Sequence, residues 1–369
     1  MTQPFFRIEM LPALHGDCLL VEYGTPQRTR RLLIDGGPIG AFQALQQRLE
    51  ALPTGERRFE LMVLSHVDTD HIDGLVRLFA EPLPWPFVVK DVWFNGWRHL
   101  EQAHGLLGGK QGEYFSALLA HRLDDGCWNG AFEGGAVVVP DDQSLPVRSL
   151  AGGMRLTLLS PTVATLVKMR EAWRKDVGNA IEPGDLDAAW ELLSTQKRYL
   201  PGQGLLGSTP ELDALLQKQS RPDSAAANGA SIAFLAEYAN WSCLFLADAH
   251  TEVVCASLKR LLAARALERL QVDAVKVAHH GSKGNTTDEL MALIESPRFL
   301  FSSNGAQFGH PDHEAVQRVI GRSTSTVPTL YFNYRTAHNH EWESPALQQR
   351  LKYRTHYNPD ETAPLRLTL

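Results

Sequence analysis

Short apolar segments interrupted by glycine and proline follow one another in the N-terminal part of the chain. This pattern is typical of strands joined by tight turns. The segment FELMVLS is almost continuously apolar, as in a strand that is buried on both faces. Strands are therefore predicted over 6–14, 17–24, 30–37 and 59–65.

Apolar residues at helical spacing separate these segments from a second series of strands. Helices are predicted over 40–52, 73–81 and 112–123. Beyond them, strand-like and helix-like segments alternate. The expected strands are 154–161, 231–238, 242–250, 272–282 and 298–305, and the expected helices are 253–270 and 286–294.

Two strand-rich halves, each with helices to cover its outer face, predict an α/β fold. The expected architecture is a four-layer αββα sandwich, formed as a single domain over residues 1–369. Residues 163–227 are first helix-prone and then polar, and end in small residues. This segment predicts a helical insertion or lid within the domain rather than a separate core.

Composition narrows the class of protein. The chain has 369 residues, of which 44% are hydrophobic and 21% charged, as in soluble globular proteins. The net charge of −6 argues against a strongly basic nucleic-acid-binding coat. A signal-peptide pattern, a membrane-spanning apolar run and CxxC spacing are all absent from the sequence. We therefore expect a cytoplasmic protein without a membrane segment, and the sequence leaves its oligomeric state open.

The sequence LSHVDTDHIDGL, at 64–75, crowds ionisable groups at the end of a predicted buried strand. Such a cluster is costly unless the groups are paired or bind a metal. In an extended loop His66 and Asp68 fall on the same side, Asp70 is placed to cap the next helix, and His71 lies in its first turn. An N-cap aspartate beside unrelated surface histidines would explain Asp70 but not the other three residues.

Three further segments repeat this arrangement. Asp248 ends one apolar strand, His279 and His280 end another, and His310 follows a third. In α/β architectures ligands bind beyond the carboxyl ends of strands. Acids and histidines at several strand ends therefore predict one shared site, although each segment taken alone could be a surface loop.

In this order the segments resemble the metallo-β-lactamase superfamily, whose signature is His-x-His-x-Asp-His. They resemble more closely the hydrolase domain of ComEC-type DNA-uptake proteins, in which the second histidine is an aspartate. Residues 163–227 and the last fifty or so residues are not covered by the resemblance. The matching pieces are HGDCLLVEYG, LLIDGG, LSHVDTDHIDGL, NGASIAFL, FLADAH, VAHHGS and FGHPDHE.

The resemblance implies two divalent metal ions and assigns roles to these residues. One ion would be bound by His66 and Asp68 and the other by Asp70 and His71, with Asp248 bridging both. The roles of the three later histidines stay open; the resemblance favours His279 and His310 as ligands and His280 as a catalytic group that holds a scissile phosphate. Asp17 and Asp35 match positions that orient ligand histidines, although turn-forming aspartates are an equally good interpretation.

One departure from the family pattern affects the expected metal. Many members have another histidine ligand before the bridging acid, where this chain has Ser160. With Asp68 also in place of a histidine, the first metal position is rich in oxygen. Oxygen ligands favour Mn²⁺ or Mg²⁺, while the remaining histidines still suit Zn²⁺.

The loop HHGSKGN is suited to an anion. Its glycines allow backbone N–H groups to approach, and Ser282, Lys283 and Asn285 are candidates to bind the substrate's phosphate oxygens. A glycine turn with a solvated lysine is the alternative.

These features predict a metal-dependent hydrolase. Besides His280, Asp70 is a candidate catalytic residue, because it could take a proton from a metal-bound water. The leading hypothesis is a phosphodiesterase or nuclease acting on DNA or nucleotides, with a possible partner protein in bacterial antiviral defence. The alternatives are a hydrolase of a small ester, lactone or thioester, and a metal-bearing interaction module with little activity.

Overall fold

The computed structural model describes residues 3–100, 110–141, 144–177, 181–201, 225–323 and 327–369. The predicted insertion, 163–227, lies partly outside these residues. Within the described residues, no helix is long and apolar enough to cross a membrane.

The first sheet is built mainly from the N-terminal part of the chain. Neighbours from β18 to β3 pair antiparallel, and those from β3 to β7 pair parallel. In spatial order its six strands are β18 (Leu365–Thr368), β1 (Phe5–Met10), β2 (Leu19–Thr25), β3 (Arg28–Ile34), β5 (Leu61–Val63) and β7 (Val92–Trp93).

The second sheet has eight described strands. Neighbours from β8 to β11 pair antiparallel, and those from β11 to β17 pair parallel. In spatial order they are β17 (Arg354–Tyr357), β16 (Thr329–Phe332), β15 (Arg298–Phe301), β13 (Ala274–Lys276), β11 (Trp241–Phe245), β10 (Ala233–Tyr238), β9 (Arg155–Ser160) and β8 (Val147–Ser149). Two short pairs stand apart: β4 (Arg58–Phe59) with β6 (Val88–Val89), and β12 (Leu270–Gln271) with β14 (Ile294–Glu295).

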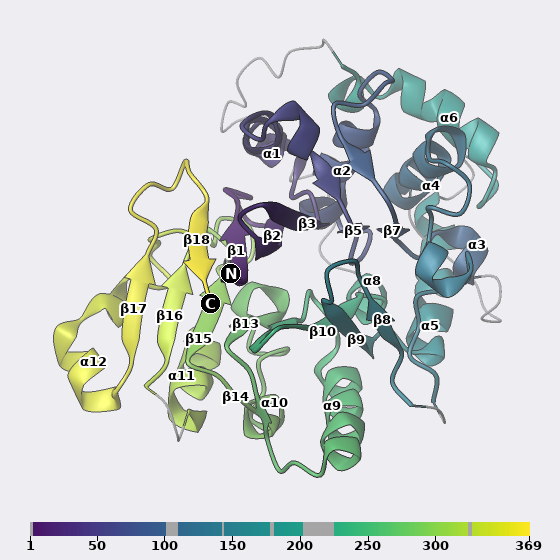
Figure 1. Ribbon diagram of the computed structural model, residues 1–369. Coiled ribbons are helices and arrows are strands. Elements are labelled where there is room, and N and C mark those ends of the chain that lie inside the picture. Colours follow the sequence, from purple (N-terminus) through teal and green to yellow (C-terminus); the bar gives the residue numbers. More distant parts are fainter. Residues whose placement is uncertain (1–2, 101–109, 142–143, 178–180, 202–224, 324–326) are drawn as a thin grey trace.

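Helices cover the outer face of each sheet, as Figure 1 shows. Over the first sheet lie α1 (Phe42–Glu50), α2 (Thr69–Phe79), α3 (Trp97–Leu100), α4 (Lys110–Arg122), α5 (Val163–Val177), α6 (Leu186–Thr195) and α8 (Ala225–Gly229). Over the second lie α9 (Thr251–Arg265), α10 (Asp288–Leu293) and α11 (His313–Arg322), with α12 (Pro345–Leu351) near its C-terminal edge.

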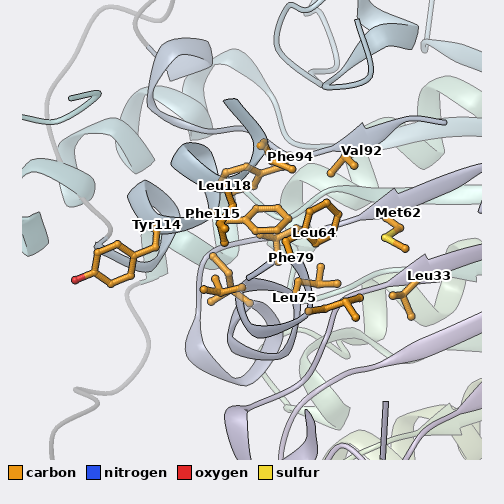
Figure 2. Packing of buried hydrophobic residues seen from close by; sticks show 14 of the residues in the cluster. Leu33, Met62, Leu64, Leu75, Phe79, Val92, Phe94, Tyr114, Phe115 and Leu118 are labelled. Carbon is orange, nitrogen blue, oxygen red and sulfur yellow. The ribbon is translucent and has the colours of Figure 1, made fainter. Parts of the chain in front are cut away.

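Three apolar clusters lie between these four layers. One is sandwiched between the two sheets, where Phe6 and Val21 share a cluster with Phe234 and Phe245. The other two join each sheet to its helices. Figure 2 shows part of the cluster on the first sheet, in which strand residues such as Met62 lie near the helix residues. The layers confirm the predicted αββα fold class.

The described parts of the predicted insertion pack onto neighbouring helices. Helix α5 contacts α3, α6 contacts α4, and residues such as Trp173 and Tyr199 belong to the same apolar cluster as α2. A function as a lid stays a prediction.

The predicted elements are present, but several end earlier than the sequence pattern suggested. The strands predicted over 242–250 and 272–282 end at Phe245 and Lys276, where the chain leaves each sheet to form the loops with Asp248, His279 and His280.

The helix predicted over 253–270 ends at Arg265. Ala266 has left-handed backbone angles (φ 52°, ψ 45°) and closes the helix, after which Leu270 enters a short strand. Apolar residues continue through this turn, so their pattern did not reveal it.

Helix α2 lies unusually close to the loop after β3. A Cβ atom on Gly74 would lie 2.0 Å from the carbonyl oxygen of Gly36, and one on Gly36 would lie 2.3 Å from the backbone nitrogen of Leu75. Only glycine at both positions allows this approach, which fixes the start of α2 relative to β3.

We expect Gly74→Ala to lower the free energy of unfolding by roughly 1–3 kcal/mol, because the methyl group has no room beside Gly36. In an open helix the same change would raise stability by about 0.5–1 kcal/mol. Urea denaturation measures the difference. Gly55→Ala is the control, because nothing lies within 4 Å of its added methyl. Equal stability of the two variants would contradict the close approach.

Glu113 of α4 is a fully buried carboxyl in the helical layer. Its Oε1 accepts hydrogen bonds from Trp173 Nε1 at 2.6 Å and from the Gly184 backbone nitrogen at 3.0 Å. Burial raises the pKa of Glu113 to about 7, although both hydrogen bonds lower it. The folded protein therefore retains a proton that the unfolded chain releases near pH 4.5.

Because the folded-state pKa of Glu113 is the higher one, the contribution of Glu113 to stability is greatest below about pH 4.5 and declines as the pH rises toward 7. We expect Glu113→Gln to remove this component, which amounts to up to about 3 kcal/mol. Urea denaturation of the wild type and the variant at several pH values measures it. Glu268→Gln, at an exposed position, should leave the profile unchanged. Parallel pH profiles for wild type and Glu113→Gln would show that Glu113 ionises normally.

Candidate metal centre

Strands from both sheets end at one edge of the sandwich, where they place acidic and histidine side chains. Asp35 follows β3, His66 follows β5, Asp248 follows β11, and His279 and His280 follow β13. Strands β3 and β5 are parallel neighbours, as are β11 and β13, so each pair ends on the same side. The topology thus brings together residues far apart in the sequence.

Helix α2 begins two residues earlier than a cap at Asp70 would place it. Its N-cap is Asp68, with extended backbone angles (φ −69°, ψ 143°), and Asp70 lies in the first turn. The prediction of Asp70 as the cap was therefore wrong. The Asp68 side chain makes no capping hydrogen bond, and its Oδ2 lies 3.5 Å from His66 Nε2.

Asp248 lies at the centre of the cluster and is almost fully buried. Four imidazoles surround one of its carboxylate oxygens. Measured from Asp248 Oδ2, the Nε2 atoms lie at 3.5 Å for His71, 3.5 Å for His279, 3.7 Å for His280 and 4.0 Å for His66. This is the position that a bridging carboxylate would occupy.

Asp70 completes a second group of donors. Its Oδ2 lies 3.6 Å from His71 Nε2 and 3.3 Å from His280 Nε2. His280 was predicted to contact substrate, but its ring is fully buried among the donor atoms. This placement suits a metal ligand better than a group that meets substrate at the surface.

The spacing of these donors is the distance expected of ligands that share an ion. Two nitrogen or oxygen atoms, each about 2.1 Å from a tetrahedral metal, lie about 3.4 Å apart. The donor pairs that Asp68, Asp70 and Asp248 form with these histidines lie between 3.3 and 3.7 Å apart, except for His66 and Asp248 at 4.0 Å. Two of the possible ligand groups are His66, His71 and Asp248, and Asp70, His71 and His280.

Unused hydrogen-bonding capacity also indicates a metal. The Nε2 atoms of His66, His71 and His280 and the Oδ1 atom of Asp248 are buried, and none has a hydrogen-bond partner among the described residues. Leaving such atoms unsatisfied costs about 1–3 kcal/mol each. Divalent cations bound by the two ligand groups would satisfy these atoms, so the residues present fit the metal centre that the sequence predicted.

Asp35 orients His71 directly and His66 through Ser65. Its Oδ2 lies 2.9 Å from His71 Nδ1 and accepts a hydrogen bond from Ser65 Oγ, and its Oδ1 accepts one from the Ser65 backbone. Ser65 Oγ in turn lies 3.0 Å from His66 Nδ1. Contacts of this kind fix the orientation of a ligand imidazole and leave its Nε2 free for the ion.

Asp17 supports His280 in the same way. Its Oδ1 lies 3.3 Å from His280 Nδ1 and accepts a hydrogen bond from Ser302, and its Oδ2 lies 2.7 Å from the buried Lys276 ammonium. Asp17 lies between β1 and β2 of the first sheet, whereas Lys276 ends β13 and Ser302 directly follows β15 of the second. This ion pair therefore ties the two sheets together beside the cluster.

Left-handed backbone angles turn the two adjacent histidines into the centre. His279 has φ 45° and His280 has φ 53°, in a region that non-glycine residues rarely adopt. The His279 ring is oriented by Asn285 Oδ1 and Asn228 Nδ2, which lie 3.2 and 3.3 Å from its Nδ1. Strain of this kind persists where surrounding contacts enforce it, as at functional sites.

The charges of the cluster reinforce one another. Burial raises the pKa of Asp248, but the neighbouring imidazoles, His279 first, hold it well below its usual range. Conversely, burial lowers the pKa of His280, but Asp248 and Asp17 raise it to about 9. The carboxylates are thus ionised as ligands must be, and a metal must displace protons from the imidazoles, so binding should strengthen with pH.

His310 lies beside this centre rather than within its donor groups. Its ring centroid is 5.3 Å from that of His279 and 6.0 Å from that of Phe308. Burial, followed by the charges of His279 and His280, lowers the pKa of His310 to about 4. A ligand role for His310 stays a prediction.

The predicted phosphate-binding loop faces partly away from the cluster. Lys283 Nζ pairs with Glu314 Oε1 at 3.2 Å on the surface. Asn285 donates to the carbonyl oxygens of Asp248 and Ala249, and Ser282 Oγ accepts from the Gly284 backbone within its own turn. Asn285 thus holds the centre in place, and contacts of all three residues with substrate stay predictions.

Three residues of the site were missed by the sequence analysis. A lysine in an apolar strand, Lys276, was an available signal, since a buried ammonium needs an acidic partner. Ser302 and Asn228 gave no signal, because a serine and an asparagine near strand ends are common in loops. Ser160, at the position where the resemblance led us to expect a histidine, is fully buried at the end of β9.

No protein-family model and no curated protein matches the chain. Distant similarities to solved structures do exist. The metallo-β-lactamase fold protein YhfI from Bacillus subtilis has 10% sequence identity and a TM-score of 0.42, over 99% of each chain.

Zn²⁺-bound PqqB from Methylobacterium extorquens has 11% identity and a TM-score of 0.40, over 98% of this chain and all of that one. An E377D mutant of CmlA β-hydroxylase has 12% identity and a TM-score of 0.37, over all of this chain and 54% of that one. Similarities this distant assign no activity, so we base the function on the geometry of the site.

We expect His71→Ala combined with Asp248→Ala to abolish tight binding of Mn²⁺ or Zn²⁺, since both residues contribute to the shared donors. Metal content after dialysis, measured by elemental analysis, tests this. The wild type should also unfold at a higher temperature with metal than without it. His340→Ala, at an exposed histidine, is the control. Unchanged metal content in the double variant would show that the ion binds elsewhere.

Proposed function

We propose that the chain is a metal-dependent hydrolase and that its first substrate class is phosphodiesters in DNA or nucleotides. The observation that carries the hydrolase proposal is the spacing of buried donors around Asp248 and Asp70, which suits ions that share ligands. Divalent ions bound there would lower the pKa of a coordinated water toward neutrality and polarise the attacked group.

The residues of the chain have distinct parts in this chemistry. His66, His71 and His280 would bind metal through their free Nε2 atoms, with Asp248 between them. Asp70 is placed to accept a proton from a nearby water, because its side chain is 10% exposed whereas that of Asp248 is 3% exposed. Asp17 and Asp35 would keep the imidazoles oriented throughout.

Support for a phosphodiester comes from the sequence resemblance and from the paired donor groups. Two ions sharing ligands can bind the attacking and the leaving oxygens of a phosphoryl group at once. The oxygen-rich donors at Asp68, Asp70 and Asp248 suit Mn²⁺, which is common in such chemistry.

A small ester, lactone or thioester is the second candidate, and Phe308 favours it. This half-buried ring lies 6.4 Å from the ring of His279 and stacks on His310 at 6.0 Å. It offers an apolar surface next to the centre, and Lys283 already pairs with Glu314. A compact substrate with an apolar or flat group could pack against the Phe308 ring beside the metal centre.

We expect metal-stripped protein to cleave bis(p-nitrophenyl) phosphate and single-stranded DNA when Mn²⁺ is restored, and less with Mg²⁺ or Zn²⁺. Asp70→Ala should lower kcat by about 10²- to 10⁴-fold, because the proton acceptor is lost. Initial rates with each metal measure this, with His340→Ala as the unaffected control.

p-Nitrophenyl acetate and a thiolactone, assayed in parallel, separate the two substrate classes. Hydrolysis of these alone would replace the phosphodiesterase proposal by the second candidate. Protein that binds metal but cleaves none of these substrates would contradict the hydrolase proposal and favour an interaction module.

A further inference from the structure

Helix α2 carries, besides Asp70 and His71, a third ionisable residue with no part in the chemistry proposed above. Asp73 is 2% exposed and lies one turn after Asp70. Its Oδ1 accepts a hydrogen bond from the Tyr199 hydroxyl, and its Oδ2 lies 3.7 Å from Arg198 Nη1. Both partners come from the 3₁₀ helix η4 (Lys197–Tyr199), within the predicted insertion.

The contact of Asp73 with Tyr199 and Arg198 is held in place by tight packing. Tyr199 is fully buried, and its ring packs edge-on against Tyr114 of α4 with centroids 6.2 Å apart. The Arg198 guanidinium lies over the Tyr199 ring, 4.5 Å from its centroid. A buried carboxylate that loses such partners is strongly destabilised, so Asp73 has few alternative positions.

The opposite side of α2 is also fixed. The carbonyl oxygen of His71 accepts a hydrogen bond from the Gly36 backbone at 2.8 Å, and Gly74 donates to Gly37 at 2.9 Å. The first turns of α2 are thus held between the loop after β3 and the helical segment that ends in Tyr199. Because Asp70 and Asp73 are three residues apart on one helix, a rotation at Asp73 also moves Asp70.

We propose that Tyr199 and Arg198 are positioning residues, through which the described residues 181–201 set the geometry of the metal-binding residues on α2. The hydrogen bond and the charge at Asp73 fix the rotation of α2 about its axis. That rotation determines how Asp70 and His71 face His280 and Asp248. The inference rests on the metal centre proposed above and is independent of the substrate.

Tyr199→Phe removes the hydrogen bond while keeping the buried ring. We expect it to weaken Co²⁺ and Mn²⁺ affinity by about 10-fold, the lower end of the range for a lost direct partner of a metal ligand, because Tyr199 acts on the ligands only through α2. The visible d–d absorption of the Co²⁺-loaded protein should also shift, because the ligands change their angles around the ion. Competition with a fluorescent chelator measures affinity, and circular dichroism confirms folding.

Tyr353→Phe is the matched control. Tyr353 is also a buried tyrosine, 2% exposed, whose hydroxyl donates to the Trp342 carbonyl at 3.0 Å, far along the chain from α2. Trp173→Phe is a second control. Trp173 also belongs to the predicted insertion, but the hydrogen bond that this change removes goes to Glu113 of α4 and not to α2. Both controls should lose some stability and keep the affinity and spectrum of the wild type.

An unchanged Co²⁺ spectrum and affinity in folded Tyr199→Phe would overturn the positioning role, whatever happens to activity. The same loss of affinity in Trp173→Phe would also overturn it, because the effect would then reflect loosening of the predicted insertion as a whole. Wild-type protein that binds neither ion would overturn the metal centre as well. Metal binding with the expected Tyr199→Phe effect but without hydrolysis would uphold the inference and contradict only the proposed function.

Discussion

The burial of several charged groups at one edge of the sandwich is the constraint on which the rest of this structure depends. Asp17, Asp35 and Asp248 are each no more than 2% exposed, and His71 and His280 are fully buried. Isolated charges would be too costly there, so every group has either a partner or a free atom that faces a shared centre. Strand ends, loops and α2 are therefore placed so that each buried charged group has such a partner.

The partners come from different layers, which links the site to the whole architecture. Asp17 joins the first sheet to Lys276 and Ser302 of the second, and Asp35 connects the ends of β3 and β5 with α2. Loss of Lys276 would remove the ammonium that pairs with the buried Asp17 carboxylate. The same contacts that stabilise the junction of the two sheets therefore orient the imidazoles, and stability and metal binding share one set of residues.

The helical layer on the first sheet is linked to the metal centre through helix α2. The close approach at Gly36 and Gly74 fixes α2 from one side, and the contact between Tyr199 and Asp73 fixes it from the other. Sequence periodicity placed a helical insertion here but gave no sign of this link. A buried tyrosine and an aspartate more than a hundred residues apart become partners only through tertiary packing.

The sequence by itself determined the strand and helix pattern, the αββα class and the candidate donors, because periodicity and strand-end clusters are local signals. Only the tertiary structure decided how those donors pair: that Asp68 rather than Asp70 caps α2, that His280 lies among the donors, and that Lys283 turns to Glu314. Side-chain direction at a strand end depends on backbone angles such as the left-handed φ of His279 and His280, and on neighbours from other layers. Neither is encoded in residue spacing along the chain.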